Sequence, residues 1–157
     1  MKLCIIAVGR TRASPEDELT EDFLKRARAA APKLGFMGLE LAIVETSKAA
    51  TLDARKAEEA ERIAAKTPKG ALVIALDERG KSWGSEAFAK MLAKRRDEGR
   101  DIAFVIGGPD GLAEDFRNGE TLGFGTQTWP HLLVRAMLAE QIYRALTILS
   151  GHPYHRA

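Results

Sequence analysis

Short runs of continuous apolar residues recur along this chain and constrain its fold more than any other feature. Three such runs, rich in aliphatic and β-branched residues, occupy residues 3–8, 71–76 and 102–106, and a fourth run at residues 39–44 is interrupted only by Glu40. A continuous apolar run is typical of a strand that is covered on both faces. Helical patterns separate the runs. The chain is therefore predicted to be an α/β protein, with a mostly parallel sheet and helices on both faces.

The first predicted helix has clear ends. Ser14 supplies a capping hydroxyl, Pro15 stands at the first helical position, acids follow, and Pro32 should end the helix near residue 31. A cap at Ser85 is expected for a later helix. The other expected elements are helices over residues 49–66, 85–99 and 131–150, a short helix or turn at 113–117, and an extended segment at 122–128.

Length and composition limit the class of protein. The 157 residues, without a repeat or linker, fit one domain over residues 1–157. The 24 basic and 22 acidic side chains give a net charge of +2, which disfavours a polybasic protein and still permits a local basic patch. The single Cys4 excludes a disulfide framework and a cysteine-rich zinc site. We expect a cytoplasmic protein with no metal and no membrane segment, and an inert Cys4 within the first strand.

Glycines follow the predicted strands at the edge where parallel sheets bind ligands. Gly9 follows the first strand, and residues 107–111 (GGPDG) follow the fourth. Such glycines let the backbone approach a ligand, although an ordinary tight turn fits the residues equally well. The motif is neither the dinucleotide fingerprint nor a P-loop. Arg10 and Arg12 either contact phosphate or are solvated loop charges.

Residues 122–131 add exposed amides and two aromatic rings near the same edge. A ligand-binding loop and a flexible connector with core aromatics are both compatible with this segment. Apolar residues cover more than one face of the last predicted helix. This predicts that the helix is buried on several sides and takes part in a subunit interface. Glu140 and Arg144 in this helix form either an ordinary i,i+4 ion pair or a group placed where substrate charge develops.

The last seven residues are chemically rich for a chain end. His152, Tyr154, His155 and Arg156 carry groups that stack on bases, bind phosphate and move protons. The alternative is a structural tail that packs on a neighbour.

Several segments in one order resemble a known family. They are residues 76–81, 106–111, 130–135, 140–145 and 152–156. Together they resemble the large-subunit ribosomal RNA methyltransferases that act on N3 of a pseudouridine, a branch of the SPOUT class of knotted methyltransferases. The resemblance covers essentially the whole chain and is densest after residue 71. It implies a C-terminal deep trefoil knot, an exception to un-knotted topology, and a homodimer in which one tail completes the other subunit's site.

The resemblance also implies the roles of individual residues. S-adenosylmethionine would be bound by Leu76, Gly107, Phe124, Gly125, Thr126, Gln127, Thr128 and Trp129. Tyr154 and His155 would position the base, and Arg144 or Arg156 would stabilise the developing charge. Glu140 would orient Arg144. The partner would be large-subunit ribosomal RNA, met on the assembled ribosome.

The chain departs from the family pattern at one point, and two other functions are alternatives to the one that the resemblance implies. The family pattern has serines where this chain has Gly123 and Gly125, so contacts from those hydroxyls are absent. A non-catalytic nucleotide- or RNA-binding α/β module would have a similar sheet and basic tail, but it has no need of a cofactor pocket. A flavodoxin-like signalling domain is disfavoured, because no acidic phosphoacceptor cluster follows the strands.

Overall fold

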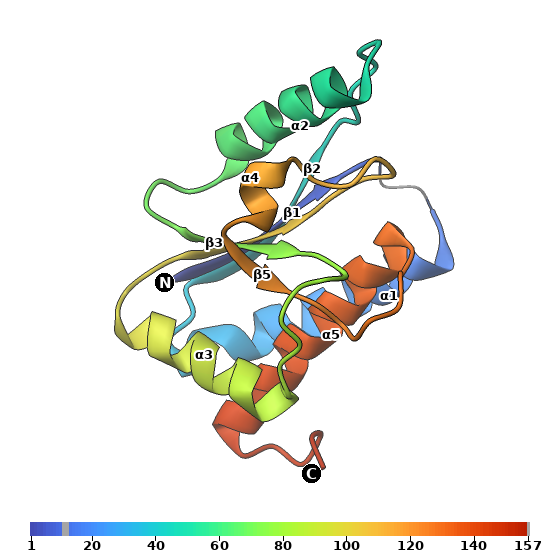
Figure 1. Cartoon of the computed structure of the whole chain (residues 1–157). Helices are drawn as coiled ribbons and strands as arrows, with labels where there is room; N and C mark the ends of the chain where they lie inside the picture. The colour runs from blue at the N-terminus through green and yellow to red at the C-terminus, as the bar shows by residue number, and fades with distance from the viewer. Residues whose placement is uncertain (11–12, 157) are drawn as a thin grey trace.

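A five-stranded parallel sheet forms the centre of the protein (Figure 1). The computed structural model describes residues 1–10 and 13–156. The strands are β1 (Lys2–Val8), β2 (Gly38–Val44), β3 (Leu72–Leu76), β4 (Ile102–Ile106) and β5 (Glu120–Leu122). Their order is β2-β1-β4-β3-β5, and each neighbouring pair is parallel. The four apolar runs are all strands, as predicted.

Helices cover both faces of the sheet, which confirms the predicted architecture. They are α1 (Pro15–Ala30), the 3₁₀ turn η1 (Ala31–Leu34), α2 (Leu52–Lys66), α3 (Ser85–Asp97), α4 (Glu114–Arg117) and α5 (His131–Ser150). Figure 1 shows α1, α3 and α5 on one face and α2 and α4 on the other. The trefoil knot stays an expectation from the family.

Most helix ends follow the sequence signals. Ser14 Oγ accepts from the backbone N–H of Asp17 at 3.2 Å, and α1 gives way to the turn that contains Pro32. Helix α2 starts at Leu52, later than predicted, because Thr51 caps it.

Two expectations near the later elements were wrong in detail. Ser85 is the first residue of α3 and not its cap; its hydroxyl donates to Gln141 Oε1 of α5 at 2.8 Å. In the segment 122–128, strand β5 ends at Leu122, and the glycine-rich residues after it form bends. The loop that follows β5 therefore bends beside the carboxyl ends of the strands, where Gly123 and Phe124 line a cavity.

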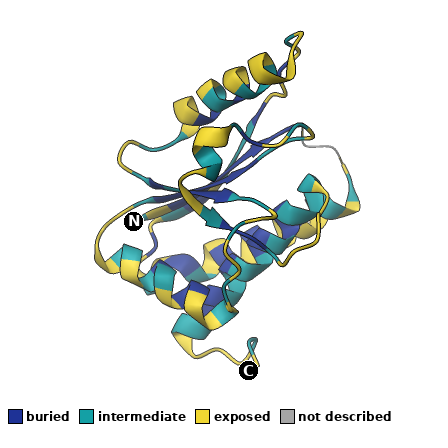
Figure 2. Ribbon diagram, in the orientation of Figure 1, coloured by how far each residue is buried: buried dark blue, intermediate teal, exposed yellow. Residues whose placement is uncertain are grey.

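Alternate residues of the strands face two separate cores, which explains the continuous apolar runs. Ile5 and Phe104 pack with α1, α3 and α5, whereas Cys4 and Ile6 pack with Ile63 of α2. Figure 2 shows the strands buried and the outer face of α2 exposed. Cys4 is buried, and burial raises the pKa of its thiol, with a further contribution from the Glu40 carboxylate. This agrees with an inert structural thiol.

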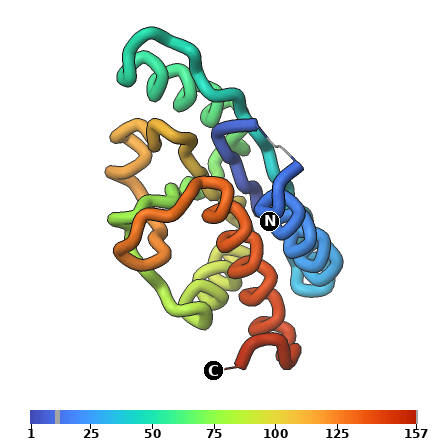
Figure 3. The backbone as a smooth tube through the Cα atoms, turned by 90° about the vertical axis from the view of Figure 1, so that its right-hand side faces the viewer, coloured from blue at the N-terminus to red at the C-terminus, as the bar shows by residue number. Residues whose placement is uncertain are grey.

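Helix α5 spans the molecule beside α1 (Figure 3). Leu138, Ile142 and Leu146 are fully buried inside the chain, so contacts with α1 and α3 account for part of its apolar surface. The predicted subunit interface on its remaining surface stays a prediction. Within the described residues, no helix is long and apolar enough to span a membrane.

Candidate functional site

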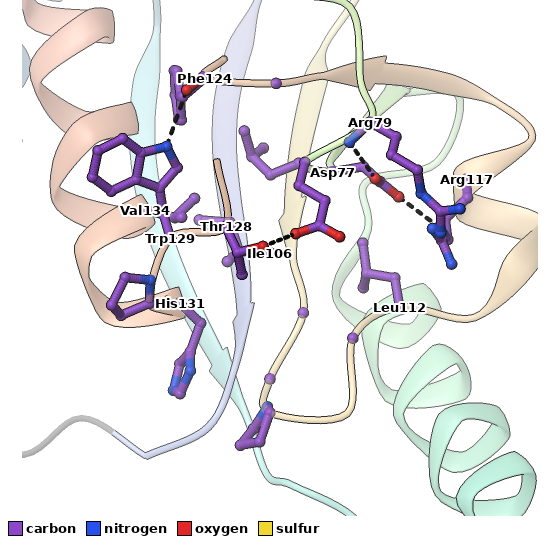
Figure 4. A pocket seen from close by; sticks show the side chains of 18 of the residues that line it. Asp77, Arg79, Ile106, Leu112, Arg117, Phe124, Thr128, Trp129, His131 and Val134 are labelled. Atoms are coloured by element: carbon purple, nitrogen blue, oxygen red, sulfur yellow. Dashed lines mark hydrogen bonds and ion pairs between the residues drawn. The ribbon is translucent and has the colours of Figure 1, made fainter. Parts of the chain in front are cut away.

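A cavity of about 480 Å³ lies beyond the carboxyl ends of β3, β4 and β5, beside the start of α5 (Figure 4). Its volume is that of a site for a drug-sized organic ligand. Five of the predicted cofactor residues line it: Leu76, Gly107, Phe124, Thr128 and Trp129. The structure therefore brings these residues together, from three separate segments of the chain. Their role in binding a cofactor stays a prediction.

The other three predicted cofactor residues lie in the same loop but outside the cavity lining. Gly125 borders a neighbouring hollow, and its N–H donates to Ser82 Oγ at 3.1 Å. Thr126 and Gln127 are exposed and do not line the cavity. The loop from residue 123 to 130 thus contributes its two ends to the cavity and turns its middle outward.

Two glycines let the loops over the cavity cross at backbone contact. A Cβ on Gly80 would lie 2.7 Å from the carbonyl carbon of Leu122, and one on Gly123 would lie 2.8 Å from the Gly80 oxygen. Real Cβ atoms do not approach backbone atoms so closely, because the contact is strongly repulsive. Gly125 adopts a left-handed conformation with φ of 87°. The two glycines that replace the expected serines therefore suit the local backbone.

Side-chain hydrogen bonds join the same loops (Figure 4). Thr128 Oγ1 donates to Glu78 Oε2 at 2.5 Å, and Trp129 Nε1 donates to the Phe124 carbonyl at 3.0 Å. Across the cavity, Arg117 Nε of α4 donates to Asp77 Oδ2 at 2.6 Å. Sequence reasoning did not single out Arg117, because no local pattern links it to a partner forty residues earlier. Hydrogen-bonded polar side chains therefore line one part of the cavity, and apolar side chains, including Ile106 and Val134, line another.

The glycine-rich turn after β4 forms another side of the cavity. A Cβ on Gly107 would lie 3.0 Å from the carbonyl carbon of Gly111, and the Gly111 N–H donates to the Gly108 carbonyl at 3.0 Å. Asp110 Oδ2 accepts from Arg55 Nε of α2 at 2.8 Å. Arg55 Nη1 also donates to the Ala49 carbonyl at 3.2 Å. The turn is tight, as predicted, and α2 holds it from outside.

A second group of predicted site residues meets at the C-terminal end of α5. Glu140 Oε1 accepts from Arg144 Nη2 at 2.6 Å and from the Tyr154 hydroxyl at 2.9 Å. Arg144 Nη1 lies 3.1 Å from His155 Nδ1, and its guanidinium carbon lies 4.9 Å from the centre of the Tyr154 ring. The expected i,i+4 ion pair is present, and it belongs to a larger cluster that includes the tail.

The cluster fixes the protonation states of two of its members. The hydrogen bond to Glu140 raises the pKa of Arg144 above its usual value, so the guanidinium is cationic. Burial, followed by the hydrogen bond to Glu140, raises the pKa of Tyr154, so the phenol is neutral at physiological pH. This arrangement offers a fixed cation, while the single proton of the Tyr154 hydroxyl is donated to Glu140. Arg156 is exposed and takes no part in the hydrogen bonds of this cluster.

One chain keeps the cavity and the cluster apart. His131 borders the cavity at the first turn of α5, and Arg144 lies in the same helix, about 20 Å further along its axis at 1.5 Å per residue. A small substrate cannot touch both ends at once.

A buried arginine, Arg135, lies near the cavity in the largely apolar helix α5. Arg135 is 1% exposed, and its Nη2 donates to the carbonyls of Val8 at 2.9 Å and Gly9 at 3.2 Å. Its Nε and Nη1 are buried without hydrogen-bond partners. Burial lowers the pKa of this guanidinium, and the Asp17 carboxylate opposes that effect. A charged group within an apolar stripe was the available signal.

Two further expectations concern charges and metals. Arg10 is described and exposed, whereas Arg12 lies outside the described residues. Among residues 1–10 and 13–156, no group of three His, Cys, Asp or Glu side chains is placed to hold a metal ion.

Comparisons with known proteins match the whole length of the chain. A family profile described as predicted SPOUT methyltransferase matches residues 1–155. A protein of Hyphomonas neptunium named ribosomal RNA large subunit methyltransferase H is 52% identical over 160 aligned positions, with 100% of both chains covered. Proteins of the same name from Allorhizobium ampelinum and Rhodopseudomonas palustris are 49% and 51% identical, also with 100% of each chain covered.

Proposed function

The chain belongs to the SPOUT methyltransferase family, and from this membership we propose that it transfers a methyl group from S-adenosylmethionine to N3 of a pseudouridine in large-subunit ribosomal RNA. The sequence resemblance is confirmed at the level of the family. Full-length similarity to relatives named as large-subunit ribosomal RNA methyltransferases is the observation that carries the proposal. The family's knot, an assembled ribosome as the substrate and a cytoplasmic location are parts of the same proposal.

The residues of the cavity fit the proposed methyl donor. Apolar side chains of Leu76, Ile106 and Val134 offer a surface for a flat ring, and Gly107 and Gly108 line the cavity in the turn after β4. The backbone contact between Gly80 and Gly123 holds together the two loops beside this surface. The cofactor would supply a methyl group that its sulfonium already activates.

The cluster at the end of α5 supplies what the acceptor nitrogen requires. N3 of a pseudouridine lies between two carbonyl groups and must lose its proton before it forms a bond to the methyl carbon. The negative charge then spreads over the two carbonyl oxygens. The Arg144 guanidinium, which Glu140 holds in place, is suited to stabilise that charge. The His155 imidazole or water would accept the proton.

The separation along α5 supports a homodimer with composite sites. Arg144 of one subunit would reach a nucleotide that lies at the cavity of its partner. The cavity would then position the methyl group, and the partner's tail would position the base, so that the reacting atoms lie in line. His155 and Arg156 would extend the tail toward the RNA.

Two measurements test the proposal. Calorimetric titration with S-adenosylmethionine, together with light scattering, should show saturable binding by a dimer. Ribosomes that lack the modification should then acquire one methyl group per large subunit, and Arg144→Ala should abolish most of the transfer while binding the cofactor normally. A dimer that binds neither the cofactor nor ribosomes would contradict the proposal; binding without transfer would favour a non-catalytic RNA-binding module.

A further inference from the structure

A second cavity, of about 640 Å³, lies next to the one assigned to the cofactor. The loops after β1, β2 and β4 and the first turn of α5 enclose it. Pro109 and His131 border both cavities, so the two share a wall. Strands β1 and β4 are neighbours, and the chain leads from β1 to β2 on one side of this pair and from β4 to β5 on the other. Open α/β sheets bind ligands at such points. A group in the second cavity would lie beside the methyl donor.

Basic side chains at the rim of this cavity are available to a ligand. Arg10 and Lys48 line it and are exposed, and neither forms an ion pair with any carboxylate of the described residues. Glu45 is the acidic residue of the lining. The rim therefore has an excess of positive charge.

The start of α5 adds partial positive charge to the cavity. His131 and Leu132 are the first residues of this 20-residue helix, and both line the cavity. Pro130 precedes them and provides no side-chain cap. The first N–H groups of a helix have no acceptor within the helix, and together they favour an anion.

A buried cation lies directly behind the floor of the cavity. Gly9 lines the cavity, and a Cβ on this residue would lie 3.4 Å from Arg135 Nη2 and 3.8 Å from His131 Nε2. Arg135 is 1% exposed; its Nη2 donates to the Val8 and Gly9 carbonyls, whereas Nε and Nη1 are the buried donors without partners. A buried guanidinium adjacent to a polar space projects a positive field into it, which the Asp17 carboxylate partly offsets here. This observation is independent of the helix terminus and also indicates an anion.

We propose that the second cavity binds a backbone phosphate of the substrate RNA beside the target nucleotide. The inference rests on the proposed function, since it assumes an RNA substrate. A phosphate there would be met by Lys48 and Arg10 from outside, by the N–H groups of α5, and by the field of Arg135 from below. It would fix the register of the RNA, so that the target base lies at the shared wall, next to the methyl donor.

The carboxylate of the cofactor is the other source of an anion, and two parallel measurements distinguish it from the RNA. Arg10→Ala/Lys48→Ala removes both rim cations without touching the core. Lys69→Ala is the matched control, because Lys69 is exposed and precedes β3, at the opposite edge of the sheet. For each protein we would measure the Kd for S-adenosylmethionine by calorimetry, and the Kd for large ribosomal subunits by sedimentation without turnover.

The expected result is a roughly ten- to hundredfold weaker affinity of the double variant for large subunits, and a shallower dependence of that affinity on salt. Its Kd for S-adenosylmethionine and all properties of Lys69→Ala should equal those of the wild type. Weaker cofactor binding with unchanged subunit binding would overturn the proposal in favour of the carboxylate, and no change in either affinity would overturn it as well. Failure of the wild type to methylate subunits that it binds would instead contradict the proposed function.

Discussion

The backbones at Gly123 and Gly80 are in contact, so that a side chain at either position has no room. A Cβ at position 123 would lie 2.8 Å from the Gly80 oxygen and 2.9 Å from the Asp77 oxygen. Although the family pattern has serine here, we expect Gly123→Ser to separate the two loops, to destabilise the protein by about 1–3 kcal/mol, and to weaken cofactor binding. Urea unfolding and calorimetry measure the two effects.

Gly84→Ser is the matched control for this substitution. Gly84 is the N-cap of α3, has an ordinary backbone conformation, and has open space where a Cβ would be added. Serine is favoured at such positions, so this variant should be as stable as the wild type or slightly more stable. Equal losses in both variants would show that the crossing of the loops is not what position 123 requires.

His131 predicts a dependence of stability on pH. Burial, and then the charge of Arg135, lower the pKa of its imidazole below the ordinary value of 6.5. The unfolded chain therefore binds the proton more readily than the folded chain. The resulting stability is fully present above pH 6.5 and is lost as the pH falls through the lower, folded pKa. The free energy of unfolding of His131→Gln should decline less between pH 8 and pH 5 than that of the wild type.

Some side-chain pairs of the site could be predicted from the sequence, and others could not. The Glu140–Arg144 pair was predictable, because residues four apart share a helix face. The bonds of Asp77 with Arg117 and of Asp110 with Arg55 were not, because they join residues 40 and 55 positions apart on different elements. Such pairs depend on how the elements pack, and no local periodicity encodes that.

At the scale of elements, α2 contributes Lys56 to the lining of the cavity and supports the cavity through an ion pair. Arg55 of this helix binds Asp110 in the glycine-rich turn that lines the cavity. We expect Arg55→Ala to leave the fold intact and to raise the Kd for S-adenosylmethionine about two- to fivefold, because the turn loses its outer support and the pair is partly exposed. The exchange Arg55→Asp/Asp110→Arg should restore part of the affinity, and calorimetry measures both. Full affinity in Arg55→Ala would show that the turn holds its shape unaided.

Elements were predictable where their signal was continuous. The strands β1 to β4 follow from apolar runs, interrupted only by Glu40 in β2. The helix α5 follows from its many apolar residues and from Pro130, a residue that suits a helix start. Strand β5 covers only three residues, and its pairing with β3 comes from tertiary contact, so an extended segment was predicted several residues too far along. The strand-end loops were predictable as a site because parallel sheets place them at one edge.

At the scale of the whole molecule, the chemistry is divided between two regions that one chain holds apart. The cavity lies at the start of α5, and the Arg144 cluster lies near its end. Composite sites in a homodimer make this division testable by mixing two defective chains. Leu76→Trp would fill the cavity with an indole ring, and Arg144→Ala would remove the cationic group of the cluster. Each variant alone should be inactive.

Dimers with one copy of each variant are isolated with two different affinity tags. If the cluster acts on its partner's cavity, the Arg144→Ala chain supplies an intact cavity and the Leu76→Trp chain supplies an intact cluster. One of the two sites then works, and methyl transfer to ribosomes should recover to about half of the wild-type rate. The reverse arrangement is the control: a chain with both substitutions, paired with a wild-type chain, has no complete composite site and should be inactive. Activity in the control and none in the mixed dimer would show instead that each chain completes its own site.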